Sequence, residues 1–426
     1  MVSAENGKYL LVFGATMPLR ERAIVAAVRV FDGPIATVSP TARTRSGKFF
    51  DHILTGDPSN PDSALQAVLN FEQRTGLTPA AVVPFIDGSL MAGRAIADHY
   101  RLPYLSRQSI EDSSINKNRM KDRLLAAGLA TPRYRQVGGV AELDAAIDEF
   151  GLPCVIKPSA FGGSLGVRLI TDRAEAAEAY RYVRTIIDDN AATFSVKNRA
   201  VQVEEFCVLA GEVSVEVLNH HDRRSVLAVV DKSLGPKPYF AEVGHRLPSV
   251  HSARQDVREL AVDACAAVGL EFGLAHVEIR LEGDQQPQII EVGARTAGGG
   301  ILDLVERAYG VAPYELHVRS YLDRLDGLPP ATAAAGVAAI AVLKAPAGQI
   351  AELRTPDAVD AAVDSYEVLA PVGALSAAVP ANYLTREGYV ECFWPDADPA
   401  TLPADAHLRI AGELAGQIFR TIDPVS

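Results

Sequence analysis

The chain has 426 residues, of which 48% are apolar and 22% are charged, and its formal net charge is −12. At roughly 100–200 residues per domain, this length predicts two to four domains, each with its own core. Because an acidic protein repels polyanions at long range, non-specific binding to nucleic acids or anionic membranes is disfavoured, although local basic groups can still bind a small polyanion such as a nucleotide.

The first segment of the chain alternates strands and helices. The apolar runs Tyr9–Phe13 and Ala80–Phe85 are typical of strands buried on both faces of a parallel sheet. A helix, Leu90–Tyr100, and a short strand, Leu102–Leu105, are predicted next. The loop after the first strand reads FGATMP, so the G-x-G-x-x-G dinucleotide fingerprint is missing. We therefore expect an α/β domain over residues 1–110.

The middle segment has a different pattern. Helices are predicted at Lys117–Ala127, which ends at Gly128, and at Val140–Phe150, which ends at Gly151. The strands and helices that follow do not alternate regularly. This pattern indicates an α+β domain over residues 111–326.

A glycine-rich loop joins two predicted strands within Cys154–Ile170, which reads CVIKPSAFGGSLGVRLI. Its small residues could present backbone N–H groups to phosphates, and they are Ser159, Gly162, Gly163, Ser164 and Gly166. Lys157 ends the first of these strands and could neutralise a phosphate. The segment is not a Walker A loop, because no Gly-Lys-Ser/Thr opens a helix. An ordinary glycine-rich turn is the alternative interpretation.

Further polar residues lie at the ends of the next predicted strands. The strand Val201–Phe206 ends in two acids, Glu204 and Glu205, and its edge could offer backbone groups to an adenine. Glu212 could accept hydrogen bonds from ribose hydroxyls, although an acidic turn between strands is the alternative.

A second cationic cluster follows. Lys232 and His245 stand in the segments Asp231-Lys232 and Val243–Pro248. A structural role is the alternative for His245.

The segment Ala275–Ala294 predicts a hairpin of two strands, Ala275–Leu281 and Gln288–Ala294. If the hairpin is centred between Asp284 and Gln285, Glu278 lies directly opposite Glu291 on the same face. A loop with an even number of residues about that centre keeps this pairing, and an odd loop would break it.

Directly opposed carboxylates lie about 5 Å apart at Cβ and repel each other, so something should offset the cost. A shared proton or a hard cation such as Mg²⁺ would do so. Two solvated glutamates on an exposed sheet face are the alternative. Arg295 and the glycines at positions 298–300 favour an anionic ligand nearby, because a guanidinium and a close backbone approach suit one.

The last segment begins at the break Leu328-Pro329-Pro330 and is rich in alanine and valine. Its short β runs indicate a third, smaller unit over residues 327–426, packed on the second. The weakly polar run Ala331–Leu343 is only about two-thirds as long as a membrane span.

The compartment follows from the N-terminus and the cysteines. Met1–Lys8 lacks the apolar core of a signal peptide. The four cysteines, which form no C-x-x-C pair, suggest a reducing environment, and they are Cys154, Cys207, Cys265 and Cys392. We therefore expect a soluble, cytoplasmic protein.

Five motifs, taken in order, resemble those of the ATP-grasp superfamily, and specifically of its carboxylate–amine ligases such as the L-amino-acid ligases. The motifs are NKNRMKDRL then GLATP, VIKPSAFGGSLGV, VEEF with GEVSVEV, DKS with EVGHRLPS, and HVEIRL with IIEVGARTAGG. The resemblance covers the region from Ser113 to Tyr321. It implies a pre-ATP-grasp α/β domain over residues 1–110, a two-lobed ATP-grasp domain over residues 111–326 and a lid-like C-terminal α+β subdomain over residues 327–426.

The resemblance also implies roles for individual residues. The residues that would bind ATP are Lys117, Lys157, Ser159, Gly162, Gly163, Ser164, Glu204, Glu205, Phe206, Cys207 and Glu212. Glu278 and Glu291 would hold one or two Mg²⁺ ions, for which Mn²⁺ can substitute. Arg295, Lys232 and His245 would be catalytic, with Arg295 at the transferred phosphoryl group. Many family members carry asparagine where this chain has Gly293, so a second metal ion must rely on the two glutamates, phosphates and water.

The implied activity joins a carboxylate, expected to be that of an amino acid, to an amine through an acyl-phosphate, with release of ADP and phosphate. One alternative is a ligase of the same fold that uses a non-amino-acid acceptor, of a purine-biosynthetic or carboxylase-like kind. Another is a regulator that binds ATP without turnover. The expected partners are small-molecule carboxylates and amines, with neither nucleic acid nor membrane, and the resemblance is compatible with a homodimer.

Overall fold

The computed structural model describes residues 7–15, 19–41, 47–191, 198–329, 332–377 and 380–423. The first residues of the expected polar N-terminus, the end of the FGATMP loop, and Pro330 with Ala331 lie outside these ranges. Among the helices of the described ranges, none combines the length and the apolar character that crossing a membrane requires.

The first part of the chain forms a parallel sheet with the strand order β3-β2-β1-β4. Its strands are β1 (Lys8–Phe13), β2 (Ile35–Ser39), β3 (His52–Thr55) and β4 (Thr78–Pro84), and its helices are α1 (Glu21–Val30), α2 (Pro61–Thr75) and α3 (Leu90–Tyr100). The predicted strand Leu102–Leu105 is wrong. The Leu102 N–H instead bonds the Ala97 carbonyl and closes the end of α3, and Pro103 has no N–H to donate to a sheet.

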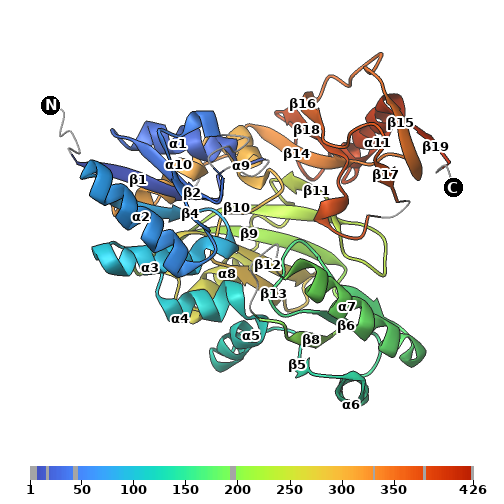
Figure 1. The fold of residues 1–426 in the computed structure, drawn as a ribbon. Helices are drawn as coiled ribbons and strands as arrows, with labels where there is room; N and C mark the ends of the chain where they lie inside the picture. Colours follow the sequence, from blue (N-terminus) through green and yellow to red (C-terminus); the bar gives the residue numbers. More distant parts are fainter. Residues whose placement is uncertain are drawn as a thin grey trace.

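A small lobe, residues 134–205, contains an antiparallel sheet with the order β5-β8-β6-β7. Its strands are β5 (Tyr134–Val137), β6 (Cys154–Pro158), β7 (Arg168–Ile170) and β8 (Val201–Glu205), and its helices are α6 (Val140–Phe150) and α7 (Ala176–Asn190). In Figure 1 it is the teal-to-green lobe at the lower right, where β5, β6, β8, α6 and α7 are labelled. The lobe has a hydrophobic cluster of its own, which includes Ile156, Val183 and Val203.

The central sheet has eight strands in the order β13-β12-β9-β10-β11-β14-β18-β16. Its strands are β9 (Gly211–His220), β10 (Arg223–Leu234), β11 (Glu242–Leu247), β12 (Phe272–Leu281), β13 (Gln288–Gly293), β14 (Gly336–Leu343), β16 (Val363–Val368) and β18 (Gly388–Pro395). The last three come from the predicted third unit, so the sheet continues across the predicted boundary at residue 327. The rest of that unit is a second sheet of β15 (Gly348–Leu353), β17 (Leu375–Ser376) and β19 (Phe419–Ile422), with helix α11 (Ala406–Ile418).

Further helices of the described ranges are α4 (Arg107–Ile110), α5 (Lys117–Ala126), α8 (Gln255–Ala267), α9 (Ile301–Tyr309) and α10 (Pro313–Tyr321). Of these, α10 contacts both β4 of the first sheet and β12 of the central sheet. One hydrophobic cluster includes Leu11 of β1, Val277 of β12 and Val318 of α10, so the first sheet and the central sheet share a core. The architecture confirms the predicted mixture of α/β and α+β structure. The domain boundaries themselves stay a prediction.

Candidate active site

A cavity of about 1220 Å³ lies where the first sheet, the small lobe and the central sheet meet. Most of the predicted site residues line it, namely Lys117, Lys157, Gly162, Gly163, Ser164, Glu204, Glu205, Phe206, Cys207, Glu212, Lys232, Glu278, Glu291 and Arg295. Two of them, Ser159 and His245, are not among its lining residues. The cavity is larger than the roughly 300–1,000 Å³ of ordinary small-molecule sites, so it has room for a nucleotide and a second substrate.

The two predicted metal glutamates lie directly opposite each other. Glu278 of β12 pairs with Glu291 of β13, as the hairpin pattern predicts. The loop, however, is odd, because Arg280 pairs with Gln288. The expectation that an odd loop would break the pairing is wrong, since an extra residue at Ile290 forms a β-bulge that restores it.

Lysines from other elements neutralise this carboxylate pair. Lys117, the first residue of α5, places its Nζ 2.6 Å from Glu291 Oε1. Lys232 of β10 places its Nζ 2.5 Å from Glu278 Oε1 and 2.5 Å from Glu242 Oε1. The opposed acids thus have cationic partners in place of a shared proton. Although burial alone would raise it, the Lys232 ammonium lowers the pKa of Glu278 well below its usual value.

A buried histidine adds a further positive charge at Glu278. His276 Nδ1 lies 2.7 Å from Glu216 Oε1 and His276 Nε2 lies 3.3 Å from Glu278 Oε1. Although burial opposes the charged form, the Glu216 carboxylate raises the pKa of His276 to about 9. His276 therefore donates from both ring nitrogens at neutral pH. His276 is not among the predicted site residues, although its position two residues before Glu278 on one strand places both on the same face.

The glycine-rich loop forms one wall of the cavity. Gly163 and Ser164 both have positive φ, 62° and 60°, and the Ser164 hydroxyl donates to the Phe240 carbonyl at 2.6 Å. Lys157 lies at the start of this loop, where its Nζ is 2.8 Å from Glu204 Oε1. Lys121 shares the same carboxylate oxygen at 3.2 Å, and burial lowers the pKa of Lys121 to about 8.

The predicted base-binding segment lies beside this cluster. Phe206 and Cys207 line the cavity just after β8, where the chain passes from the small lobe to the central sheet. Glu205 accepts two hydrogen bonds from Arg133, with nitrogen–oxygen distances of 3.0 and 3.1 Å. Glu212 is held by Arg280 at 3.1 Å. Phe206 and Cys207 therefore line the cavity between two acids that are each held by an arginine.

Arg295 is held by a residue that the sequence analysis missed. Its Nε lies 3.0 Å from Asp87 Oδ2, and Asp87 follows β4 of the first sheet. Although burial opposes the charge, Asp87 raises the pKa of Arg295 above its usual range. Arg20 contacts the residue after Arg295, since its Nη1 donates a hydrogen bond to Thr296 Oγ1 at 2.5 Å. The signal for Asp87 was its place directly after a buried parallel strand, where α/β sheets bind ligands.

Ser159 and His245 lie outside the cavity wall for physical reasons. Ser159 is fully buried, and its hydroxyl accepts from Asn118 Nδ2 at 2.9 Å, so it braces the loop against α5. His245 is buried beside Gly299, where an added Cβ would lie 2.8 Å from His245 Nε2. Burial lowers the pKa of His245 to about 3, so it is neutral and does not join the cationic cluster that the sequence analysis expected.

The donor set of the opposed glutamates fits a hard cation. The side chains of Glu278 and Glu291 are 18% and 23% exposed, so both are reachable from the cavity. Mg²⁺ takes one or two carboxylates and completes its shell with phosphate oxygens and water. The present partners of these carboxylates, Lys117, Lys232 and His276, are all positively charged groups, so both carboxylates are already placed to bind a cation.

Comparison with known proteins identifies the fold around this cavity. A family model described as an ATP-grasp domain matches residues 150–303. The alanine–anticapsin ligase of Bacillus subtilis (strain 168) is 29% identical over 219 residues, which are 47% of this chain and 45% of that relative. The chain therefore spans less than half of that relative's length.

Two other similarities extend further. The formate-dependent phosphoribosylglycinamide formyltransferase of Methanocaldococcus jannaschii is 25% identical over 298 residues, 66% of this chain and 67% of that relative. The crystal structure of an L-amino acid ligase from Bacillus licheniformis matches with a TM-score of 0.80 and 20% identity, over 98% of this chain and 99% of that one. The resemblance predicted from the sequence is thus confirmed. Residues 150–303 match an ATP-grasp domain, and nearly the whole chain shares the fold of an L-amino-acid ligase.

Proposed function

We propose that this protein is an ATP-dependent ligase that joins the carboxylate of an amino acid to an amine, with release of ADP and phosphate. The observation that carries the proposal is one cavity that the opposed Glu278 and Glu291 line together with Lys117, Lys157 and Arg295. Such a site suits a nucleoside triphosphate with its metal ion, because the carboxylates can hold the ion and the cations can bind the phosphates. The similarity to the alanine–anticapsin ligase supports the amino-acid substrate.

The charges explain how the chain would prepare ATP for transfer. Lys117 and Lys157 now pair with Glu291 and Glu204. On binding of ATP these ammonium groups would turn to its phosphates, while Glu278 and Glu291 would hold Mg²⁺. When bound, the ion supplies Lewis-acid neutralisation of the phosphate oxygens. A substrate carboxylate oxygen then attacks the γ-phosphorus, the bond to the β-phosphate oxygen breaks, and ADP leaves.

The second half of the reaction needs an enclosed acyl-phosphate. The amine nitrogen attacks the acyl carbon, the carbon–oxygen bond to phosphate breaks, and the nitrogen loses a proton to give the amide. Arg295 would stabilise charge on the phosphoryl oxygens, because Asp87 fixes its guanidinium at the cavity wall. The surrounding walls would limit hydrolysis of the intermediate. His245 is buried and neutral, so we assign it a packing role beside Gly299 in place of the catalytic one.

A second candidate is a ligase that uses formate or another non-amino-acid substrate. The similarity to a formate-dependent phosphoribosylglycinamide formyltransferase favours it, since that match covers more of the chain. The two candidates share the ATP site and differ in the carboxylate and the amine that they join. A cytoplasmic location, Mg²⁺ or Mn²⁺ as the ion, and a homodimer belong to the same proposal.

The test is product analysis with a matched pair of variants. The chain is incubated with ATP, Mg²⁺ and pooled amino acids, and the products are identified by mass spectrometry while ADP release is followed. Parallel reactions contain formate with phosphoribosylglycinamide. We expect dipeptide masses in the first reaction, and we expect Glu291→Gln to abolish amine-dependent ADP release. Glu282→Gln, an exposed glutamate in the loop of the same hairpin, should keep it.

Three results would count against the proposal. Wild-type turnover by Glu291→Gln would contradict the assignment of Glu291 as a ligand of Mg²⁺. Formylated product without dipeptides would favour the second candidate. ATP binding without ADP release under every acceptor would indicate a regulator that has lost turnover.

A further inference from the structure

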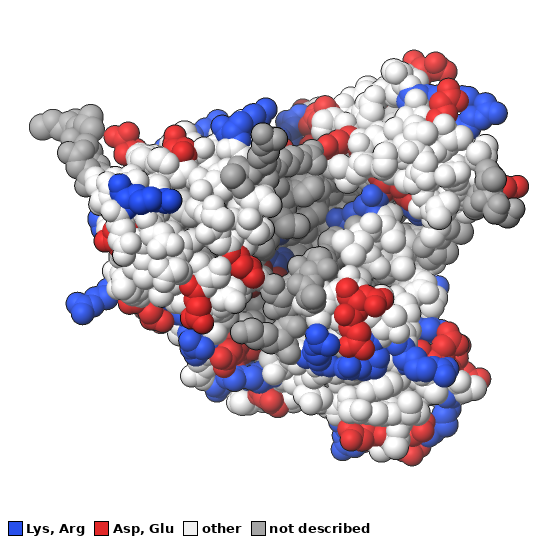
Figure 2. All heavy atoms as spheres, viewed as in Figure 1, with Lys and Arg blue, Asp and Glu red and all other residues white. Residues whose placement is uncertain are grey.

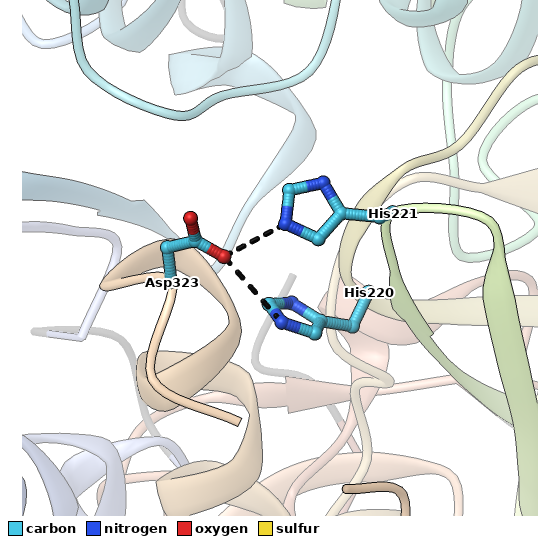
Figure 3. Close-up of side chains that lie close together, drawn as sticks. All are labelled: His220, His221 and Asp323. Carbon is cyan, nitrogen blue, oxygen red and sulfur yellow. Dashed lines mark hydrogen bonds and ion pairs between the residues drawn. The ribbon is translucent and has the colours of Figure 1, made fainter. Parts of the chain in front are cut away.

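Two histidines and an aspartate meet outside the cavity described above. His220 ends β9, His221 begins the turn before β10, and Asp323 follows the end of α10. Figure 3 shows both imidazole rings directed at the same carboxylate oxygen of Asp323. None of the three residues lines the cavity that holds the proposed ATP site. The proposed ligase activity leaves this cluster without a role.

The spacing of the three side chains is close to that of metal ligands. His221 Nε2 lies 2.7 Å and His220 Nε2 lies 3.4 Å from Asp323 Oδ1, and one ligand atom of each residue lies within 4.8 Å of the others. Zinc–nitrogen and zinc–oxygen bonds of about 2.0–2.2 Å place neighbouring ligand atoms about 2.9 Å apart at right angles and about 3.4 Å apart at the tetrahedral angle. The distance from His220 to Asp323 already matches the tetrahedral value, and a shift of roughly 0.2–0.7 Å at His221 would bring its nitrogen to ligand spacing from the same oxygen.

Hydrogen bonding satisfies only part of the cluster. The contact between His221 and Asp323 is an ordinary hydrogen bond. His220 is 3% exposed, its Nε2 contact is longer than the usual N–H···O range, and its Nδ1 has no hydrogen-bond partner among the described residues. A buried imidazole thus points a poorly satisfied nitrogen at a carboxylate. An ion between them would supply the missing interaction.

We propose that His220, His221 and Asp323 bind a divalent transition-metal ion, for which Zn²⁺ is the best match. Two imidazoles with one carboxylate suit Zn²⁺, Cu²⁺ or Ni²⁺, whereas Mg²⁺ prefers oxygen ligands. His221 and Asp323 are about half exposed, so an ion reaches the site from solvent and keeps water in its remaining position. The ion ties the β9–β10 turn to the segment after α10, and so stabilises the central sheet against that helix.

The test uses the full chain without a polyhistidine tag, in excess Mg²⁺ and without nucleotide, so that the proposed ATP site does not contribute. Visible absorption of bound Co²⁺ and the thermal unfolding midpoint with added Zn²⁺ are measured. The variants are His221→Asn and Asp323→Asn, because both positions have positive φ, 57° and 55°, and asparagine tolerates that conformation. His99→Asn, an exposed histidine on α3, is the matched control.

We expect the wild type and His99→Asn to show Co²⁺ absorption bands and a midpoint that rises with Zn²⁺. Both site variants should lose the bands and at least about tenfold in Zn²⁺ affinity, while their midpoints in metal-free buffer stay close to that of the wild type. The proposal is overturned if the wild type shows no bands or midpoint shift. It is also overturned if His221→Asn and Asp323→Asn keep both signals, since the ion would then lie elsewhere.

Discussion

Lys117 determines how readily the opposed glutamates accept a cation. Its ammonium lies 2.6 Å from Glu291 Oε1, and its side chain is only 6% exposed. A metal ion must compete with this partner when no nucleotide draws the lysine away. The pair of Lys232 with Glu278 has the same consequence on the facing strand. At the scale of single residues, then, metal binding and phosphate binding are coupled through the same side chains.

We therefore predict that Lys117→Met raises the affinity of the nucleotide-free chain for Mn²⁺. Because one short ion pair no longer competes with the metal ion, the affinity for Mn²⁺ should rise about tenfold, which corresponds to about 1.4 kcal/mol. The same change should weaken the binding of ATP, because its phosphates lose a cationic partner. Calorimetric titration with Mn²⁺ and then with ATP measures both effects. Lys48→Met, at an exposed lysine, should change neither. An unchanged or lower Mn²⁺ affinity in Lys117→Met would contradict the exchange of partners.

Helix α10 connects the first sheet to the central sheet through one histidine. His317 is fully buried, its Nδ1 accepts from the Leu274 N–H of β12 at 2.9 Å, and its Nε2 lies 2.8 Å from the Pro84 carbonyl of β4. Only the neutral ring with a proton on Nε2 satisfies both partners. In agreement with this, burial lowers the pKa of His317 to about 3.

This element gives a prediction with a definite sign. A histidine whose pKa is lowered from its ordinary 6.5 to about 3 contributes stability that is complete above pH 6.5 and is lost as the pH falls toward 3. This one histidine can change the free energy of unfolding by at most about 1.4 kcal/mol per pH unit. His317→Leu should cost about 2–5 kcal/mol, because two buried backbone groups lose their partners.

Urea unfolding between pH 4 and 7, a range of about three units, measures both effects. The difference in stability between the wild type and His317→Leu should shrink as the pH falls, because the neutral form that makes the two bonds becomes harder to keep. His99→Asn should show no such change. A difference that stays constant over this range would show that the protonation of His317 does not matter for folding.

Several elements could be predicted from the sequence because their signals are local. The helices Leu90–Tyr100 and Val140–Phe150 have the predicted bounds. Glu278 meets Glu291 as predicted, although a β-bulge after an odd loop produces this pairing in place of the expected even loop. The pairing of β14 with β11 could not be predicted, since nothing in an alanine-rich strand specifies a partner almost a hundred residues away. The contact of Lys117 with Glu291 depends in the same way on packing between distant elements.

At the scale of the whole molecule, the charge is spread over the surface while the site is locally balanced. Figure 2 shows acidic and basic side chains interspersed on one face. Inside the cavity, Lys117, Lys157 and Lys232 each pair with a glutamate. The net charge of −12 therefore describes the exterior, and an anionic nucleotide meets cations that change partners.

The hydrophobic clusters divide the molecule differently from the predicted domains. The first sheet and the central sheet share one cluster, whereas the small lobe has its own. We predict that the small lobe opens independently, so that the amides of β6 and β8 exchange with deuterium faster than those of β9 and β12. Hydrogen exchange followed by mass spectrometry measures this. Equal protection of the two sets in nucleotide-free protein would contradict it.

ATP with Mg²⁺ should slow the exchange of the small lobe. Lys157 and the glycine-rich loop belong to that lobe while Glu278 and Glu291 belong to the central sheet, so a nucleotide held by all of them closes the opening. At a free ATP concentration one hundred times its Kd, opening that requires release of ATP should slow about a hundredfold. Glu291→Gln should keep the exchange rates of the nucleotide-free lobe, because the substituted residue lies outside the lobe. It should lose most of the protection by ATP, because it removes one of the two proposed metal ligands. If ATP instead slowed β9 and β12 alone, the nucleotide would not bridge the two parts.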